Sequence, residues 1–284
     1  MIAERTEAVI LSVDSMQVFV GMDIGTAKPD PATRSRFGYR MIDVADPSEE
    51  HTVADFQAAG SAILDEIEAA DGNAVIAGGS GLHFRSLVDP LSFPPTDAET
   101  RSELEAMSAE AVREELLAAD PAVGEVVDLA NPRRVLRAVE VLRLTNVTPS
   151  ERAASGEAEA VRSYRAVRPF SAIGVDPGPI IGDRIERRFD EMLSAGLVAE
   201  VADLAPRLGR TARQAVGYRE LLPTVEGAGD LESARSEAIR STVSLAKRQR
   251  TYFGRDPRIQ WIPWHHETGK MLDKAIEALA KDAT

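Results

Sequence analysis

The sequence of 284 residues contains no cysteine, which excludes disulfides, thiolate nucleophiles and zinc sites built on cysteine. It has four histidines, and the adjacent pair at 265 and 266 forms no spacing typical of a metal site. No apolar run approaches the roughly 20 residues that a membrane-spanning helix needs, and the first residues lack a signal peptide's apolar segment. The composition therefore predicts a soluble, cytoplasmic globular protein without a membrane segment.

Positive charge is also scarce, because the sequence has 33 Lys and Arg but 46 Asp and Glu, which gives a net charge of -13. Nucleic-acid binding depends on neutralising phosphates, so this global sum by itself argues against it. Binding nevertheless depends on local patches. Basic residues cluster at 133–137, 184–188 and 247–250, whereas acidic residues crowd 99–115. The sequence is thus compatible with a basic groove on a protein whose net charge is negative.

The first 90 residues follow the order of a strand, a helix and a second strand. Ala8–Val13 is an apolar run typical of a buried parallel strand. Thr52 suits the cap of a helix, because apolar residues recur at helical spacing from Val53 to Ile67. Ala74–Ala77 is a second short strand. This order predicts a βαβ unit. Ligands of such sheets gather at the carboxyl ends of the strands, where Asp14 and the turn Gly78–Gly81 lie.

The middle of the chain has a different pattern. Apolar stripes at helical spacing occur between residues 91 and 165, Pro132 suits the start of a helix, and no strand pattern is present. The segment 151–160 is rich in Ala, Gly and Glu, and we expect it to be mobile. The sequence therefore predicts a helical insertion domain at 91–165 and an α/β core formed by 1–90 and 166–284.

After the insertion, the predicted elements alternate again. Phe170–Val175 is an apolar run that ends at Asp176, and Gly196 is placed to end a helix in the left-handed conformation. The other expected elements are a short strand at 39–44, helices at 180–193, 198–208, 212–224, 231–253 and 271–281, and an edge strand at 259–262.

The stretch Asp14-Ser-Met-Gln-Val-Phe-Val-Gly-Met-Asp-Ile-Gly-Thr-Ala-Lys-Pro29 resembles the signature of the tRNA dimethylallyltransferases, also called tRNA isopentenyltransferases. The resemblance continues in the family's order through Ala77–Leu82, Asn131–Arg137, Ala215–Arg219 and Leu245–Gln249. It implies a P-loop NTPase-like parallel sheet core with an inserted all-helical tRNA-binding domain. It also implies transfer of a dimethylallyl group from dimethylallyl diphosphate to N6 of an adenosine in the tRNA anticodon loop, with Mg²⁺ as cofactor. We expect a monomer.

The resemblance also implies catalytic roles. Asp14 corresponds to the general base that takes the N6 proton, and Ser80 stands where the family usually has Thr, so that its hydroxyl meets the leaving oxygen. Arg188, followed by Arg184, corresponds to an arginine that faces the diphosphate. From the residues alone, Asp14 and Ser80 can equally serve a cap or a turn, and the two arginines can form a solvated helix face. His83 stands where Tyr is common, and we expect its ring in the core.

A larger set corresponds to the family's tRNA contacts, in which arginines clamp phosphates and Tyr218 or Tyr252 stacks on bases. Gln214 stands where an Arg is common, so we expect one phosphate contact to be lost. The residues implied to contact tRNA are Asp14, Ser15, Met16, Gln17, Ser80, Arg101, Arg133, Arg134, Arg137, Gln214, Gly217, Tyr218, Arg219, Lys247, Arg248, Gln249 and Tyr252.

The clearest departure from the family is a motif that the sequence does not contain. Family members open with a strand and a Walker-type loop, Gly-x-Thr-x-x-Gly-Lys-Ser/Thr, whose backbone and Lys cradle the diphosphate and whose hydroxyl holds Mg²⁺. Without that Ser/Thr, no metal ligand is assigned. We expect that the true protein starts further upstream or that the chain is a truncated copy. Two alternatives therefore stay open, namely a non-catalytic tRNA-binding remnant and a P-loop-type small-molecule kinase.

Overall fold

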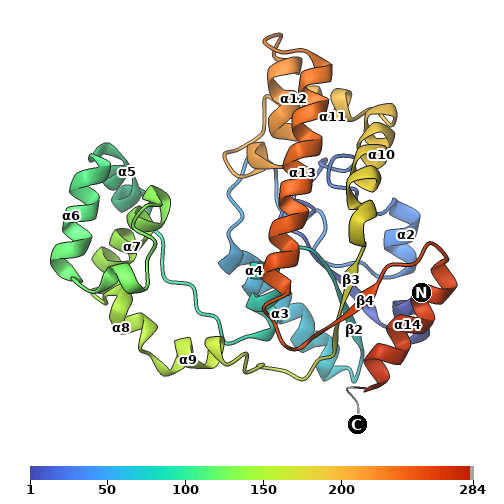
Figure 1. The fold of residues 1–284 in the computed structure, drawn as a ribbon, viewed down its shortest axis with the longest axis horizontal. Helices are drawn as coiled ribbons and strands as arrows, with labels where there is room; N and C mark the ends of the chain where they lie inside the picture. Colours follow the sequence, from blue (N-terminus) through green and yellow to red (C-terminus); the bar gives the residue numbers. More distant parts are fainter. Residues whose placement is uncertain (282–284) are drawn as a thin grey trace. The chain divides into compact units, whose positions relative to one another are not determined.

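The computed structural model describes residues 1–281 and divides the chain into two compact units. Unit 1 comprises Met1–Val88 together with the chain from Arg168 onward, and unit 2 comprises Asp89–Val167. These limits lie two residues from the limits at 90 and 165 that we expected. Both sheets belong to unit 1, and the described elements of unit 2 are all helical (Figure 1).

The first sheet of unit 1 is the predicted βαβ unit. β1 (Val9–Val13) pairs in parallel with β2 (Ala74–Gly78), in a register that sets the last residues of the two strands opposite each other. The crossover helix α3 (Val53–Ala69) begins with a capping box at Thr52, which satisfies two backbone N–H groups of the first turn. Because the strands are parallel and in register, their carboxyl ends lie at one edge of the sheet.

A second parallel pair is formed by β3 (Ala172–Asp176) and β4 (Ile259–Pro263). The α/β class with parallel pairing is confirmed. The expectation of one parallel sheet is wrong for the described residues, because β1 and β2 share no hydrogen-bonded ladder with β3 and β4. β1 thus has one strand beside it in a ladder, and on its other side it makes an isolated bridge with Arg40.

The strand expected at 39–44 is not formed. The segment makes only isolated bridges, from Arg40 to Leu11 and from Ala45 to Phe19. Met41 and Asp43 have φ values of 63° and 56°. These left-handed conformations are incompatible with an extended strand, although the apolar pattern suggested one.

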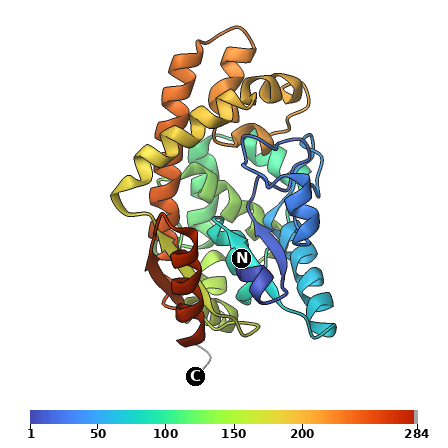
Figure 2. The same cartoon turned by 90° about the vertical axis from the view of Figure 1, so that its right-hand side faces the viewer.

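Gly196 ends α10 (Ile181–Ser194) in the left-handed conformation with φ of +103°, as predicted. The helix expected at 212–224 is interrupted, because Gly217 adopts φ of +96° just before α12 (Tyr218–Val225). In both views, α13 (Leu231–Phe253) lies beside α10 and α12 (Figures 1 and 2). The remaining helices of unit 1 are α1 (Ile2–Arg5), α2 (Pro31–Arg36), α4 (Gly81–Val88), η2 (Gly178–Ile180), α10 (Ile181–Ser194), α11 (Leu197–Leu204), η3 (Ala212–Gln214), α12 (Tyr218–Val225), α13 (Leu231–Phe253) and α14 (Thr268–Lys281).

The core of unit 1 joins β1 to the helices on either side of it. Leu11 of β1 is fully buried with Phe56 of α3, Leu197 of α11 and Leu221 of α12. Each such side chain contributes roughly 1.5–3 kcal/mol when removed from water. This apolar packing fixes the strand end that carries Asp14 relative to α12 and α13.

Unit 2 is built from short helices around its own core. Leu104, Val112, Leu116, Val135 and Val139 are buried together. The segment 151–160, expected to be mobile, forms two short helices instead, and Thr148 and Ser155 cap them. The elements are α5 (Ala98–Ala106), α6 (Ala109–Ala119), η1 (Val123–Glu125), α7 (Pro132–Thr145), α8 (Pro149–Ala153) and α9 (Gly156–Arg162).

Candidate functional site

Asp14 follows the last residue of β1, and its side chain is half-buried. Its Oδ1 accepts hydrogen bonds from the backbone N–H groups of Met16 at 2.8 Å and Gln17 at 3.3 Å. Gln17 is itself fixed, because Ser12 Oγ donates to its Oε1 at 2.7 Å and its Nε2 donates to the Thr26 carbonyl at 3.0 Å. The carboxylate is therefore held in one orientation by a tight turn at the sheet edge.

Ser80 lies at the same sheet edge as Asp14. The register pairs Val13 with Gly78, and the Ser80 backbone N–H donates to the Val13 carbonyl at 3.3 Å. The structure therefore brings the turns that carry Asp14 and Ser80 together across two neighbouring strands.

Helix α13 packs closely on the Ser80 turn. A Cβ atom on Gly79 would lie 2.4 Å from Gln249 Nε2, and one on Gly81 would lie 2.2 Å from the Tyr252 ring. Only glycine leaves room for these two side chains at those positions. Gln249 and Tyr252, predicted from a distant motif, therefore border the turn that carries Ser80.

His83 is part of the same turn, in the first part of α4. Its Nδ1 lies 3.1 Å from Ser80 Oγ, and its ring meets the Phe56 ring edge-on at 4.7 Å between centroids. Burial lowers the pKa of His83 below its ordinary value, and the nearby Asp14 charge opposes that shift without overcoming it. His83 is consequently neutral at pH 7. Its ring is partly buried, as expected, but it also makes a polar contact with Ser80.

Tyr218, which was expected to stack on a base, is fully buried. Its hydroxyl donates to Glu200, whose carboxylate also accepts from the backbone N–H groups of Asp23, Ile24 and Gly25 at 2.7 to 3.0 Å. Burial and the hydrogen bond to Glu200 raise the pKa of Tyr218 well above its usual range. In this structure the ring is not available to stack on a base, and it supports the loop after Asp14 instead.

Sequence reasoning missed Glu200, and no local pattern could have found it. Glu200 lies on α11, and its backbone partners at 23–25 are 175 to 177 residues away in the sequence. From the sequence alone, Glu200 is indistinguishable from an ordinary charged residue on the solvent-facing side of a helix. Only the tertiary fold reveals that it holds the loop.

The two predicted arginines of α10 do not contact Asp14 or Ser80 within the described chain. The Arg184 guanidinium lies over the Trp264 ring at 4.3 Å, and Arg188 is exposed and makes no ion pair among residues 1–281. Asp176 at the end of β3 is instead paired with Arg250 of α13 at 2.8 Å. Arg188 is thus the more available of the two cations for an anionic ligand.

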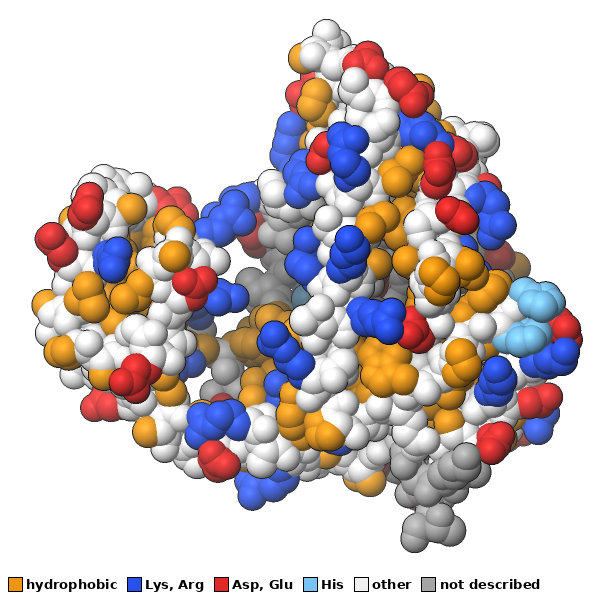
Figure 3. Space-filling model, viewed as in Figure 1, with side chains coloured by type: hydrophobic (Ala, Val, Ile, Leu, Met, Phe, Trp, Pro, Cys, Tyr) orange, Lys and Arg blue, Asp and Glu red, His pale blue; other side chains and the backbone are white. Residues whose placement is uncertain are grey.

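A hollow of about 270 Å³ lies between α12 and α13. Arg240, Ser244 and Arg248 line it at spacings of four residues, so they share one face of α13. Figure 3 shows Lys and Arg side chains along the length of this helix. The sequence prediction included two of the lining arginines and missed Arg240, although the spacing was a usable signal. The hollow is lined by Val216, Arg219, Glu237, Arg240, Ser241, Ser244 and Arg248.

The hollow remains cationic although two carboxylates border it. Arg240 Nε donates to Glu237 at 3.1 Å, and Arg219 donates to Glu220 and, at 3.2 Å, to Ser241 Oγ. Arg219 and Arg248 are both exposed. Three guanidinium groups around one hollow provide the fork-shaped donors that phosphate groups fit.

The other residues predicted to contact tRNA in unit 1 have varied settings. Ser15 and Met16 are half-buried in the Asp14 turn, whereas Gln214 and Lys247 are exposed. Gly217 is buried, and its N–H donates to Glu220 at 2.8 Å. Gly217 therefore shapes the start of α12, and its backbone N–H is already used.

In unit 2, the four predicted arginines fall into two kinds. Arg101 and Arg137 both donate to Glu140, which is fully buried, with distances of 3.3 Å from Arg101 Nε and 2.8 Å from Arg137 Nη1. Burial opposes the ionisation of Glu140, but these hydrogen bonds outweigh it and hold the pKa of the carboxyl below its ordinary value. Arg133 and Arg134, in the first turn of α7, are exposed.

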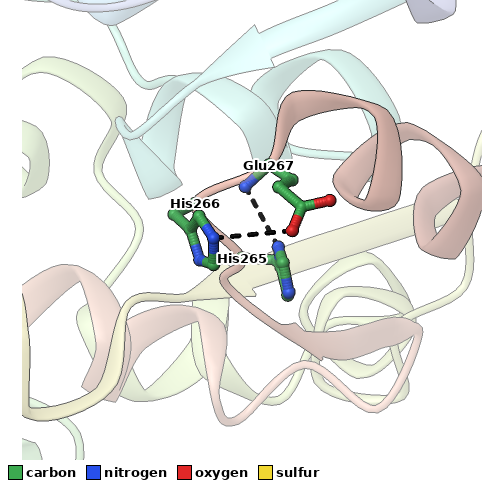
Figure 4. A group of neighbouring side chains, drawn as sticks. All are labelled: His265, His266 and Glu267. Atoms are coloured by element: carbon green, nitrogen blue, oxygen red, sulfur yellow. Dashed lines mark hydrogen bonds and ion pairs between the residues drawn. The ribbon is translucent and has the colours of Figure 1, made fainter.

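One group of possible metal ligands exists among the described residues, and it contains none of the predicted site residues. Ligand atoms of His265, His266 and Glu267 lie within 4.8 Å of one another (Figure 4). The Glu267 N–H already donates to His265 Nδ1 at 3.0 Å, and Lys270 pairs with the Glu267 carboxylate at 2.9 Å. Mg²⁺ prefers oxygen ligands, so this group does not fit the expected cofactor.

The fold and the sheet-edge site agree with the comparison to known families. Residues 17–256 match the family described as IPP transferase, and this chain belongs to that family. No helix in the described part of the chain combines the length and apolar character needed to cross a membrane.

The similar curated proteins are named tRNA dimethylallyltransferases. One from Bifidobacterium adolescentis is 37% identical over 265 residues, which cover 92% of this chain and 76% of that protein. Another from Streptomyces griseus is 37% identical over 292 residues, which cover 100% of this chain and 91% of that protein. These names favour the transferase interpretation over a small-molecule kinase.

Solved structures give the same result. A tRNA isopentenylpyrophosphate transferase from Bacillus halodurans is 29% identical with a TM-score of 0.68, covering 100% of this chain and 92% of that chain. The corresponding Staphylococcus epidermidis enzyme is 27% identical with a TM-score of 0.70, covering 100% and 93%. A eukaryotic dimethylallyltransferase acting on tRNA, 19% identical with a TM-score of 0.75, covers 99% and 72% and supports the fold alone.

Proposed function

We propose that this chain modifies tRNA by transferring a dimethylallyl group from dimethylallyl diphosphate to N6 of an adenosine in the anticodon loop. The observation that carries the proposal is the pairing of Asp14 and Ser80 at one sheet edge in a member of the IPP transferase family. We further propose that it acts as a monomer in the cytoplasm, where tRNA is available.

The reaction needs a base because the N6 lone pair is delocalised into the adenine ring. The N6 nitrogen attacks C1 of the dimethylallyl group, the bond between C1 and the bridging oxygen breaks, and its electron pair leaves with diphosphate. Asp14 accepts the N6 proton. Its Oδ1 is fixed by two backbone N–H groups, so its Oδ2 is the oxygen left to receive the proton.

The leaving diphosphate carries most of the developing charge. Ser80 would donate its hydroxyl proton to a diphosphate oxygen, and Arg188, exposed and unpaired within residues 1–281, would add a cation. Prenyl transfer from a diphosphate generally uses a divalent metal, and we propose Mg²⁺. Mg²⁺ binds through one or two protein oxygens plus phosphates, and bound to the diphosphate it would neutralise part of the charge on the leaving group.

tRNA binding is proposed for exposed cations and the aromatic ring near the site. The hollow lined by Arg219, Arg240 and Arg248 would hold backbone phosphates, and Lys247 lies on the same helix. Tyr252 is 37% exposed beside the Ser80 turn, and its ring would stack on a flipped base. In unit 2, Arg133 and Arg134 are proposed contacts, because both are exposed.

A direct assay tests the proposal. The 284-residue chain is incubated with radiolabelled dimethylallyl diphosphate, Mg²⁺ and either of two tRNA transcripts. One transcript carries adenosines in the anticodon loop, and the matched control has guanosine in their place, which lacks the N6 amine. We expect label in the first tRNA and none in the second. No label in the first would contradict dimethylallyl transfer by this chain.

A second candidate is tRNA binding without transfer. It is favoured by one observation, namely that the 284 residues contain no Walker-type Gly-x-Thr-x-x-Gly-Lys-Ser/Thr motif. It predicts salt-sensitive retention of tRNA on a filter in the same samples, together with an absence of label in either transcript.

A further inference from the structure

The contact between Ser80 and His83 joins a proposed catalytic hydroxyl to a side chain with no assigned role. Ser80 Oγ and His83 Nδ1 lie 3.1 Å apart, which is hydrogen-bond distance. The hydroxyl and the imidazole can each donate or accept, so the direction of this bond depends on which ring nitrogen carries the proton. That direction decides what the Ser80 hydroxyl can do for a ligand.

The surroundings of His83 keep its ring in place. Phe56, fully buried, meets the imidazole edge-on at an interplanar angle of 81°. Burial lowers the pKa of His83 and outweighs the opposing effect of Asp14, while the neighbouring His51 acts in the same direction as burial, so the neutral ring is favoured at pH 7. A neutral ring has one N–H donor and one acceptor.

The ligand chemistry selects one direction. Diphosphate oxygens have lone pairs and no proton, so Ser80 helps the leaving group only when its own O–H donates to the diphosphate. The Ser80 oxygen must then accept from His83, which requires the proton on Nδ1. In the opposite tautomer, Ser80 donates to His83 and turns its lone pairs toward the phosphate.

We propose that His83 is a positioning residue whose Nδ1–H donates to Ser80 Oγ and directs the Ser80 hydroxyl proton at the leaving diphosphate of the prenyl donor. The proposal rests on the proposed function. Charge on the departing oxygen strengthens a donated hydrogen bond, so the His83–Ser80 pair acts more strongly in the transition state than on the bound substrate.

Three substitutions at one position separate this role from packing. His83→Asn keeps an N–H donor close to the Nδ1 position, His83→Gln carries its N–H near the Nε2 position, and His83→Phe keeps only the ring against Phe56. We expect kcat to fall about tenfold in the Phe and Gln variants and to stay within about threefold in the Asn variant, with KM for tRNA unchanged. Equal turnover in wild type and His83→Phe would overturn the proposal.

A double-substitution cycle tests the connection to Ser80. In the Ser80→Ala background, His83→Phe should cost no further activity, because the hydroxyl that it positions is gone. A tenfold loss that persists in that background would assign His83 to packing alone. Thermal unfolding of each variant identifies any that fail to fold.

A spectroscopic readout keeps the test independent of turnover. In ¹⁵N-labelled protein, we expect the His83 Nδ1–H tautomer, and we expect dimethylallyl diphosphate to shift its resonance in wild type and not in Ser80→Ala. A Nε2–H tautomer, or no shift in wild type, would overturn the proposal. If wild type shows the shift and labels no tRNA, the proposed function fails while the His83–Ser80 bond stands.

Discussion

The arginines of unit 2 and those of the hollow between α12 and α13 were predicted by the same reasoning, yet the structure gives them different settings. Arg101 and Arg137 are tied to a fully buried carboxylate, Glu140, and hold α5 to α7. Arg248 lines the hollow and makes no ion pair among residues 1–281, and Arg219, although it donates to the buried Glu220, keeps a side chain that is 48% exposed. The exposure of the arginine side chain itself, which is 28% for Arg101 and 32% for Arg137, separates the two sets, and a motif does not encode it.

The largest expected effect concerns the buried carboxylate. Glu140→Gln removes the charge that two partly exposed guanidinium groups share, and we expect unit 2 to lose about 2 kcal/mol, or roughly 30-fold in its opening equilibrium. Hydrogen exchange of the α7 amides in the full chain, measured by mass spectrometry, reads out this loss.

Glu114→Gln is the matched control, because Glu114 is exposed on α6 and makes no ion pair within residues 1–281. The opening free energy of unit 2 in this variant, measured by the same exchange experiment, should stay within about 0.5 kcal/mol of wild type. If both variants exchange alike, the buried ion pair does not stabilise unit 2 and the contrast between the two arginine sets disappears.

The next effect concerns the hollow. Replacing Arg219, Arg240 and Arg248 together by Gln should weaken tRNA binding about tenfold at moderate salt, and the slope of log K against log salt should flatten by about 2. Filter binding across a salt series gives both values. Thermal unfolding of the triple variant separates a loss of binding from a loss of folding, because Arg219 pairs with the buried carboxylate of Glu220.

A control variant with the same change in net charge shows whether tRNA binding depends on the arginines of the hollow or on the net charge of the whole protein. Arg36, Arg187 and Arg207 are exposed in unit 1 and are not among the residues that line the hollow. Replacing these three by Gln should leave the salt slope unchanged. Equal losses from both triple variants would mean that the hollow is not a phosphate site.

The smallest effect is a pH dependence of unit 2. Glu115, through its hydrogen bond to Arg143, and Glu140, through Arg101 and Arg137 against burial, have pKa values lowered in the folded state. Their stabilisation is therefore fully present above the ordinary Glu pKa of 4.5 and is lost as pH falls through the lower folded values. Protection of the α6 and α7 amides, corrected for intrinsic exchange, should fall more in wild type than in Glu140→Gln as pH drops below 4.5, and an equal fall in the two proteins would contradict this prediction.

The sequence predicted local features well. The βαβ order, the cap at Thr52 and the left-handed Gly196 each depend on residues within one element, and each is confirmed. The placement of Asp14 followed from the same logic, because the residue after a parallel strand lies at the sheet edge.

The sequence could not predict features that depend on distant partners. The Tyr218 ring, which the motif suggested for stacking on a base, is buried with its hydroxyl bonded to Glu200. Glu140 accepts hydrogen bonds from two arginines that lie 39 and 3 positions earlier in the sequence. The missing strand at 39–44 is due to the left-handed backbone at Met41 and Asp43, where apolar pattern and conformation disagree. Such features depend on tertiary packing, to which local propensity is blind.

The central claim is that Asp14 serves the chemistry while the exposed arginines serve binding. The most direct measurement is single-turnover transfer by Asp14→Asn beside its tRNA affinity, with Asp203→Asn, an exposed residue of α11, as control. We predict a loss of at least about 100-fold in rate for Asp14→Asn, with tRNA affinity within about twofold and the control unchanged. Unchanged turnover in Asp14→Asn would contradict the account and remove Asp14 from the mechanism.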